Sequence, residues 1–305
     1  MNTAQGIFQV GRWYNPDSGT EILHQDIIKR CALSNVVLVG EQHDRSSHHR
    51  LQLHIAAGIL SHRSDVVMGF EMFPKRSNPV LEDWVSGKLD EAEFLEKVNW
   101  DKVWGFAPEL YMPLFRFCRE FRIRMIGLNC PRALVTKVGK LGWKAVDVSE
   151  RDGLTPAKPA TFEYRKALFG LGPGIGPMAT ASGPDDPKLD RFVNAQQVWD
   201  RSFACRIAEE LDQQHPPLVI GIIGSGHLRY KHGTPFQLDD LGCTETMVLL
   251  PDDKGDLVSP GIADAIFRLD PPPEHEVKAT EKYIEKVRNR EKSKKDTTGL
   301  SEKAR

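Results

Sequence analysis

An unbroken apolar run that ends on a glycine and two ionisable residues constrains the fold of this chain more than any other feature. Val36–Val39 are all apolar, and three of the four are β-branched. Such a run, closed by a turn residue, is typical of a strand that is buried on both faces of a sheet. Gly40 then allows a sharp turn, and Glu41 and His43 follow directly.

The segment after this strand has the spacing of a helix. Leucines and isoleucines recur at helical intervals over Arg45–His62, and Asp44 is a suitable N-cap. Glu41 and His43 are therefore expected where a strand passes into a helix. In open α/β sheets, ligands bind at that position.

The same alternation of strand and helix continues along the chain. Further strands are predicted at five segments: Asp65–Phe73, Arg124–Asn129, Leu218–Gly224, Thr244–Leu250 and Ala263–Leu269. Helices are predicted at Glu21–Cys31, Val80–Lys88, Asp90–Lys97, Leu110–Phe121 and Phe192–Gln213. This order predicts an α/β fold with a largely parallel central sheet flanked by helices.

Composition divides the chain into three parts. Residues 1–35 are a lead-in with a turn or short hairpin at Asn15–Gly19, and 36–270 form one α/β domain. Within that domain, 133–190 is rich in glycine and proline and is predicted to be an irregular, partly helical insertion over the sheet. Residues 271–305 form a charged tail that is expected to be disordered apart from one helix near Tyr283.

Charge and cysteine content exclude several classes of protein. The net charge is −1, so nucleic acid is not the expected partner. The five cysteines are scattered singly, which gives neither a disulfide framework nor a cysteine zinc site. No run approaches the ~18 apolar residues of a membrane span. The N-terminus lacks signal-peptide features, so a cytoplasmic protein is expected; the alternative is a periplasmic or membrane-anchored one whose leader was removed.

Polar side chains follow four of the predicted strands. They are Glu41 and His43, then Glu71, Asn129 and His227. Because parallel strands end at one edge of a sheet, these residues are expected to converge there. Two carboxylates and two imidazoles suit zinc or manganese, general acid/base chemistry, or the edges of a large ligand.

Each of these residues also has a structural interpretation. Glu71 alone often only caps a helix, and a lone His227 is more often a satisfied structural residue. The histidines of the segment 45–62 lie on several helical faces and are expected to be mostly solvated, although His49 is close enough to reach the site. Gly224-Ser225-Gly226 matches neither a phosphate loop nor a nucleophile elbow. The coincidence at four strand ends favours a functional cluster.

Several short motifs, taken together and in order, resemble a known family. They are Gly40-Glu41-Gln42-His43 with His49, Gly69-Phe70-Glu71-Met72-Phe73, Trp104-Gly105-Phe106 with Tyr111-Met112-Pro113, Leu128-Asn129-Cys130-Pro131, Ala195-Gln196-Gln197-Val198-Trp199-Asp200, and Gly224-Ser225-Gly226-His227 with Tyr230 and Gly233-Thr234-Pro235. This set resembles the ChaN-like haem-binding family. That family belongs to a superfamily with the TIKI/TraB proteases and the erythromycin esterases.

The resemblance implies haem binding linked to iron acquisition. It also implies a homodimer that encloses two stacked haems, each ligated by a tyrosine, with histidine and lysine from the partner subunit meeting the propionates. Tyr164 is the preferred ligand candidate, with Arg165 and Lys166 beside it for the propionates. Tyr111, Tyr230 and His49 are further candidates at the rim. Apolar contact to the porphyrin is expected from Phe162, Phe169, Leu171 and Ile175.

Two functional hypotheses follow, and a third hypothesis is a purely structural role. The first is a non-catalytic haem-binding protein whose haem lies at the strand ends beneath the insertion. The alternative is a metal-dependent, protease- or esterase-like hydrolase that uses Glu41, His43, Glu71 and His227. In the third, the polar residues at the strand ends only bond one another.

Overall fold

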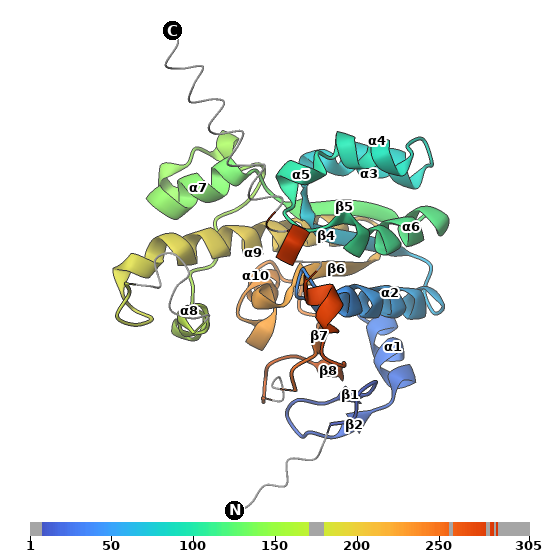
Figure 1. Cartoon of the computed structure of the whole chain (residues 1–305). Coiled ribbons are helices and arrows are strands. Elements are labelled where there is room, and N and C mark those ends of the chain that lie inside the picture. The colour runs from blue at the N-terminus through green and yellow to red at the C-terminus, as the bar shows by residue number, and fades with distance from the viewer. Residues whose placement is uncertain (1–7, 171–179, 256–258, 279–280, 284, 286–305) are drawn as a thin grey trace, which may run out of the picture.

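A largely parallel sheet forms the centre of the computed structural model (Figure 1), which describes residues 8–170, 180–255, 259–278, 281–283 and 285. Within that part of the chain its strand order is β2-β1-β8-β7-β3-β6-β4-β5. The strands are β1 Trp13–Tyr14, β2 Glu21–Ile22, β3 Val36–Glu41, β4 Val66–Pro74, β5 Arg124–Asn129, β6 Leu218–Gly224, β7 Thr246–Asp252 and β8 Ala265–Arg268. All pairs from β8 to β5 are parallel, which confirms the predicted fold class.

Helices cover both faces of the sheet. One face packs on α1 His24–Leu33, α2 Ser46–Leu60, α3 Asn78–Val85, α4 Glu91–Lys97 and α6 Met112–Glu120; α5 is Trp100–Val103. The other face packs on α9 Asp190–Leu211 and α10 Thr234–Asp240. Residues of β3 alternate between the two cores: Val37 and Val39 face α2, whereas Val36 and Leu38 face α9. Burial on both faces explains why this strand has no polar alternation.

The N-terminal residues extend the same sheet. Trp13 and Tyr14 pair antiparallel both with β2 and with β8. Glu21 and Ile22 are therefore strand residues, and the helix predicted from Glu21 begins only at His24. Edge pairing supplies backbone hydrogen bonds that a longer helix would forgo.

Helix α2 also begins differently from the prediction. Its N-cap is Arg45, and no side chain caps it. Asp44 does not cap the helix because its carboxylate pairs with the Arg45 guanidinium at 2.8 Å.

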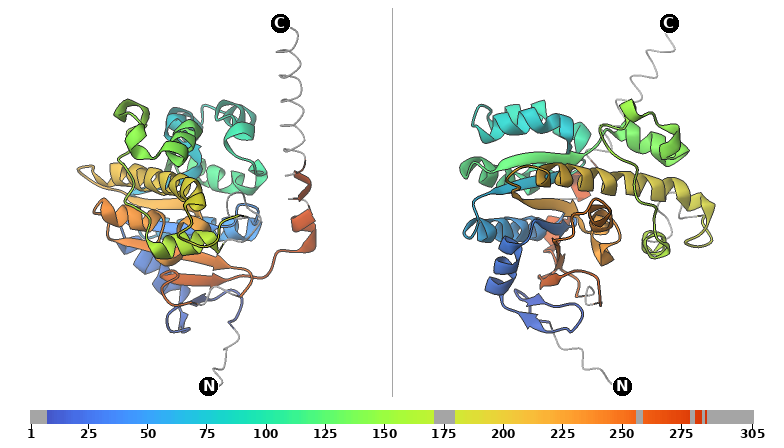
Figure 2. Two further views of the ribbon diagram at one scale, coloured as in Figure 1. Left: turned by 90° about the vertical axis from the view of Figure 1, so that its left-hand side faces the viewer. Right: turned by 180° about the vertical axis from the view of Figure 1, so that it is seen from behind.

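The insertion packs on α9, whereas the sequence placed it over the sheet. Helices α7 Arg132–Leu141 and α8 Phe162–Phe169 bury their apolar side chains against Val193 and Val198 of α9. Figure 2 shows the long α9 extending beyond the sheet, with α7 on one side of its outer half and α8 on the other. Helix α9 is buried on more than one side, so it serves as the support for the insertion.

The described part of the tail is helical at 274–278, where Glu276 accepts a hydrogen bond from Ser46. Most of the segment predicted to be disordered lies outside the described residues. Within the described part of the chain, no helix combines the length and apolarity needed to cross a membrane.

Candidate functional site

The polar residues predicted to converge at the strand ends do so in this structure. His43, Glu71, Asn129 and His227 line one cavity of about 440 Å³ at the carboxyl ends of β3, β4, β5 and β6. We call it the rim cavity. The neighbouring parallel strands bring these side chains together, although His43 and His227 are 184 positions apart in the sequence.

His43 is held by a carboxylate on its inner side. Its Nδ1 donates to Oε1 of Glu41 across 2.6 Å, which leaves Nε2 on the cavity side. Glu41 does not line the cavity and is almost completely buried. The imidazole also packs on Trp104 and Phe106, at ring-centroid distances of 4.8 and 5.1 Å.

Electrostatics keep this pair charged. Burial alone would lower the pKa of His43, but the hydrogen bond to Glu41 and the charges of Glu71 and Glu41 raise it to about 9. Burial would raise the pKa of Glu41, but His49 and His43 hold it well below its usual range. At neutral pH His43 is therefore an imidazolium, which attracts anions and does not ligate metals.

Other polar residues complete the surroundings of Glu41. Tyr111 donates to Oε1 at 2.8 Å and Gln52 to Oε2 at 3.0 Å. His49, whose Nδ1 lies 3.2 Å from Oε2, is buried, and so is His48; the expected solvation of the α2 histidines is wrong for these two. Tyr111 and His49 thus support Glu41 from inside the protein and do not line the rim cavity.

His227 is held in the same manner by a different carboxylate. It ends the short turn η7 Ser225–His227, and its Nδ1 donates to Oδ1 of Asp200 at 2.8 Å. Its Nε2 lies 3.9 Å from Oε1 of Glu71. Burial would lower the pKa of His227, but Asp200 and Glu71 raise it.

The remaining lining is aromatic and cationic. Trp104, Phe106 and Trp199 contribute rings, and Arg76, Lys102 and Arg132 contribute positive charge. Within the described chain, the side chains of these three residues form no hydrogen bond and no ion pair, in contrast to Lys75, whose ammonium pairs with Glu209. Glu71 is the one carboxylate in the described lining, and its Oε2 already accepts from the Gly224 amide at 2.6 Å.

Sequence reasoning did not identify these cations. Arg76 follows the end of β4 by two residues, and Arg132 follows the end of β5 by three. The argument that found Glu71 and Asn129 applies equally to these positions. Lys102 lies in α5 and had no comparable signal.

The residues of the insertion that were predicted to hold haem lie outside the lining of the rim cavity. Tyr164 is buried in α8, and its hydroxyl donates to Asp200. Arg165 pairs with Asp190 and the exposed Lys166 with Glu163. Neither Tyr164 nor these two cations lines the rim cavity, so iron ligation by Tyr164 stays a prediction.

The other candidates of that group are also outside the cavity lining. Tyr230 is partly exposed, donates to Ser259 and stacks on His232. Phe162 is exposed and Phe169 packs against the core of α8. Leu171 and Ile175 lie outside the described residues.

The donor set does not favour a metal ion. Among the described residues, no group of three or more His, Cys, Asp and Glu side chains is placed to hold one. Glu41 is saturated by protein donors, and His43 and His227 each use Nδ1 for a carboxylate.

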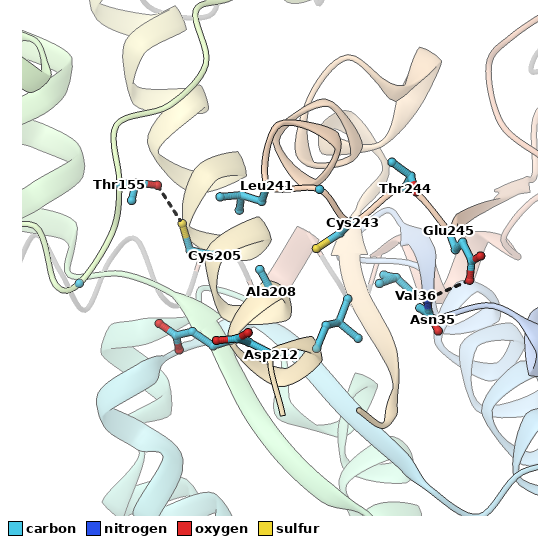
Figure 3. Close-up of a pocket in the computed structure, with 14 residues that line it drawn as sticks. Asn35, Val36, Thr155, Cys205, Ala208, Asp212, Leu241, Cys243, Thr244 and Glu245 are labelled. Atoms are coloured by element: carbon cyan, nitrogen blue, oxygen red, sulfur yellow. Dashed lines mark hydrogen bonds between the residues drawn. The ribbon is translucent and has the colours of Figure 1, made fainter. Parts of the chain in front are cut away.

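A larger cavity of about 640 Å³ lies near the opposite ends of the strands (Figure 3). It is lined by Asn35 and Val36 at the start of β3, and by Cys205, Cys243 and Thr155, whose hydroxyl contacts the Cys205 sulfur. None of the converging strand-end residues reaches it. The rim cavity is therefore the candidate site despite its smaller volume.

Comparisons with known proteins identify relatives of this fold. A family model described as haem-binding uptake, Tiki superfamily, ChaN matches residues 27–238. No curated protein matches the chain. A solved structure described as cofacial haem binding to ChaN of Campylobacter jejuni is 22% identical, with a TM-score of 0.65 over 84% of this chain and 95% of that one.

Two other solved structures have lower scores. The type III effector HopBA1 is 12% identical, with a TM-score of 0.44 over 81% of this chain and 92% of that one. A mutant erythromycin esterase in its open conformation is 9% identical, with a TM-score of 0.46 over 78% of this chain and 76% of that one.

Proposed function

Because the chain belongs to the haem-binding uptake family of ChaN proteins in the Tiki superfamily, we propose that it binds haem at the rim cavity, without catalytic turnover, in haem or iron uptake. The observation that supports this location most strongly is the combination of aromatic rings with three cations that lack ion-pair partners in the described chain. Haem has the complementary chemistry, since its porphyrin is apolar and its two propionates are anionic.

The residues present fit these two parts of haem. Trp104, Phe106 and Trp199 would contact the porphyrin, and Arg76, Lys102 and Arg132 would meet the propionates. The His43 imidazolium adds a further positive charge beneath them. When bound, haem would supply a ferric iron, which tyrosinate ligates well; Tyr164, the ligand predicted from the sequence, lies outside the lining of the rim cavity.

A homodimer that encloses two haems is part of this proposal. The Campylobacter jejuni ChaN structure is described as cofacial haem binding, and the proposal extends such an arrangement to this chain. A mass measurement in solution, with and without haemin, tests the dimer. A monomer in both samples would refute this part alone.

A titration with haemin tests the binding itself. The purified protein is titrated while the visible spectrum is followed, and metal content is measured on the same sample. We expect a saturable Soret shift. A spectrum that matches free haemin at every protein concentration would overturn the proposal.

One observation favours hydrolysis as a second candidate function. His43 and His227 each bear a carboxylate on Nδ1 and flank Glu71, an arrangement used in general acid/base catalysis. Because the pKa of His43 is about 9, its ring is already protonated at neutral pH and cannot accept a proton, so we rank this candidate second. Turnover of a panel of simple esters and peptides, lost in Glu71→Gln, would favour it over haem binding.

A further inference from the structure

Asp200 lies at the centre of a buried hydrogen-bond cluster behind the rim cavity. It belongs to α9 and is completely buried. Its Oδ1 accepts from Nδ1 of His227 at 2.8 Å and from Oγ1 of Thr234 at 3.0 Å. Its Oδ2 accepts from the Tyr164 hydroxyl.

The three donors come from three different parts of the chain. Tyr164 lies in α8 of the insertion, Thr234 begins α10, and His227 ends η7 at the cavity. Only His227 lines the rim cavity. Asp200 therefore connects the insertion to the cavity through hydrogen bonds.

Backbone packing fixes the position of this carboxylate. A side chain at Gly233 would place its Cβ 2.7 Å from Oδ1 of Asp200 and 2.4 Å from the carbonyl oxygen of His227. The cluster is therefore closed on this side, and Asp200 has little room to change its partners. Buried carboxylates are costly unless they are fully hydrogen-bonded, which the three donors achieve here.

We infer that Asp200 is a positioning residue that couples Tyr164 in the insertion to His227 in the rim cavity. Asp200 holds the His227 ring with Nδ1 turned inward and Nε2 turned toward the cavity and Glu71. Tyr164 acts on the cavity through this carboxylate and does not itself touch the bound molecule. This assigns Tyr164 a different role from the iron ligand predicted by sequence.

The sharing of one carboxylate among three donors gives the inference a directional test. Removing the hydroxyl of Tyr164 or Thr234 leaves more of the negative charge of Asp200 for His227, so the hydrogen bond between His227 and Asp200 strengthens. Replacing Asp200 by asparagine removes the charge, so the same bond weakens. Groups that face His227 from other elements, Glu71 and His43, are unchanged by all three substitutions.

The experiment is NMR of the His227 side chain in the haem-free protein. The Nδ1 proton should move downfield in Tyr164→Phe and in Thr234→Val, and upfield in Asp200→Asn. Tyr111→Phe is the matched control, because it removes a buried hydroxyl from Glu41 and should leave the His227 signal in place. An unchanged His227 signal in both Tyr164→Phe and Thr234→Val would overturn the inference.

A haemin titration of the same variants separates positioning from ligation; this second readout rests on the proposed function. Tyr164→Phe should keep the wild-type pattern of absorption bands while its affinity for haemin changes by roughly threefold or more. A change in the bands, with no change in the His227 proton, would instead make Tyr164 the iron ligand. If haemin does not bind at all, the proposed function fails while the NMR result still decides the role of Asp200.

Discussion

Glu41 accepts a 2.6 Å hydrogen bond from His43, although Glu41 itself is shielded from the cavity that His43 lines. The carboxylate therefore acts on the site from behind. It keeps the pKa of His43 at about 9 against the effect of burial, and so keeps a positive charge at the base of the cavity.

Glu41→Gln should remove that charge and weaken the fold. Without the carboxylate, the main partner that opposes the effect of burial is lost, so the pKa of His43 should fall from about 9. Because three neighbouring donors lose a charged acceptor, the free energy of unfolding should drop by about 3 kcal/mol. Titration of the His43 ring proton by NMR and urea unfolding measure the two effects. Glu245→Gln, near the other end of the sheet, is the control, and an unchanged His43 titration would contradict the prediction.

The stability of the protein should decline at alkaline pH because of His43. Its folded pKa of about 9 lies above the unfolded value of 6.5, so the stabilisation is complete below pH 6.5 and is lost as the pH rises through 9. The loss should be on the order of 2–3 kcal/mol. The free energy of unfolding is measured by urea unfolding between pH 6 and 10 for the wild type and for His43→Gln. The difference between the two curves of free energy against pH gives the loss. Parallel curves across this range would show that His43 contributes no such stabilisation.

The three cavity cations should strengthen haemin binding. Each of Arg76→Ala, Lys102→Ala and Arg132→Ala should weaken the affinity by about three- to tenfold, since a propionate loses one charged partner. Raising the salt concentration should reduce wild-type affinity in the same direction. Lys140→Ala, an exposed cation of α7 outside the lining, is the control. Equal affinities for the cavity variants and the control would place the propionates elsewhere.

The sequence was sufficient for those features of the fold that depend on local pattern. β5 and β6 begin and end at the predicted residues, because each is a short apolar run buried on both faces. The convergence of Glu71 and His227 followed from parallel pairing alone. The N-cap of α2 was wrong because Asp44 has a nearby guanidinium partner, which no helix-capping rule anticipates.

Features that depend on packing between distant segments were not predictable. Asp200 was part of a recognised motif, but its contacts with Tyr164, His227 and Thr234 exist only after α8, η7 and α10 pack around α9. The insertion was expected over the sheet because no residue pattern shows which face of α9 is left uncovered. The burial of His48 and His49 likewise depends on neighbours that sequence spacing does not identify.

Two glycines of one turn offer a matched pair for testing the geometry of the site. A Cβ at Gly224 would lie 2.9 Å from Cε1 of His43 and 3.4 Å from Oε2 of Glu71, whereas a Cβ at Gly226 meets no atom within 4 Å. Gly224→Ala should therefore displace His43 and lower the free energy of unfolding by about 1–3 kcal/mol. Gly226→Ala should be nearly neutral. The decisive measurement is haemin affinity at equal folded fraction: it should fall in Gly224→Ala and not in Gly226→Ala. Equal affinities would mean that haem binding does not depend on where His43 lies.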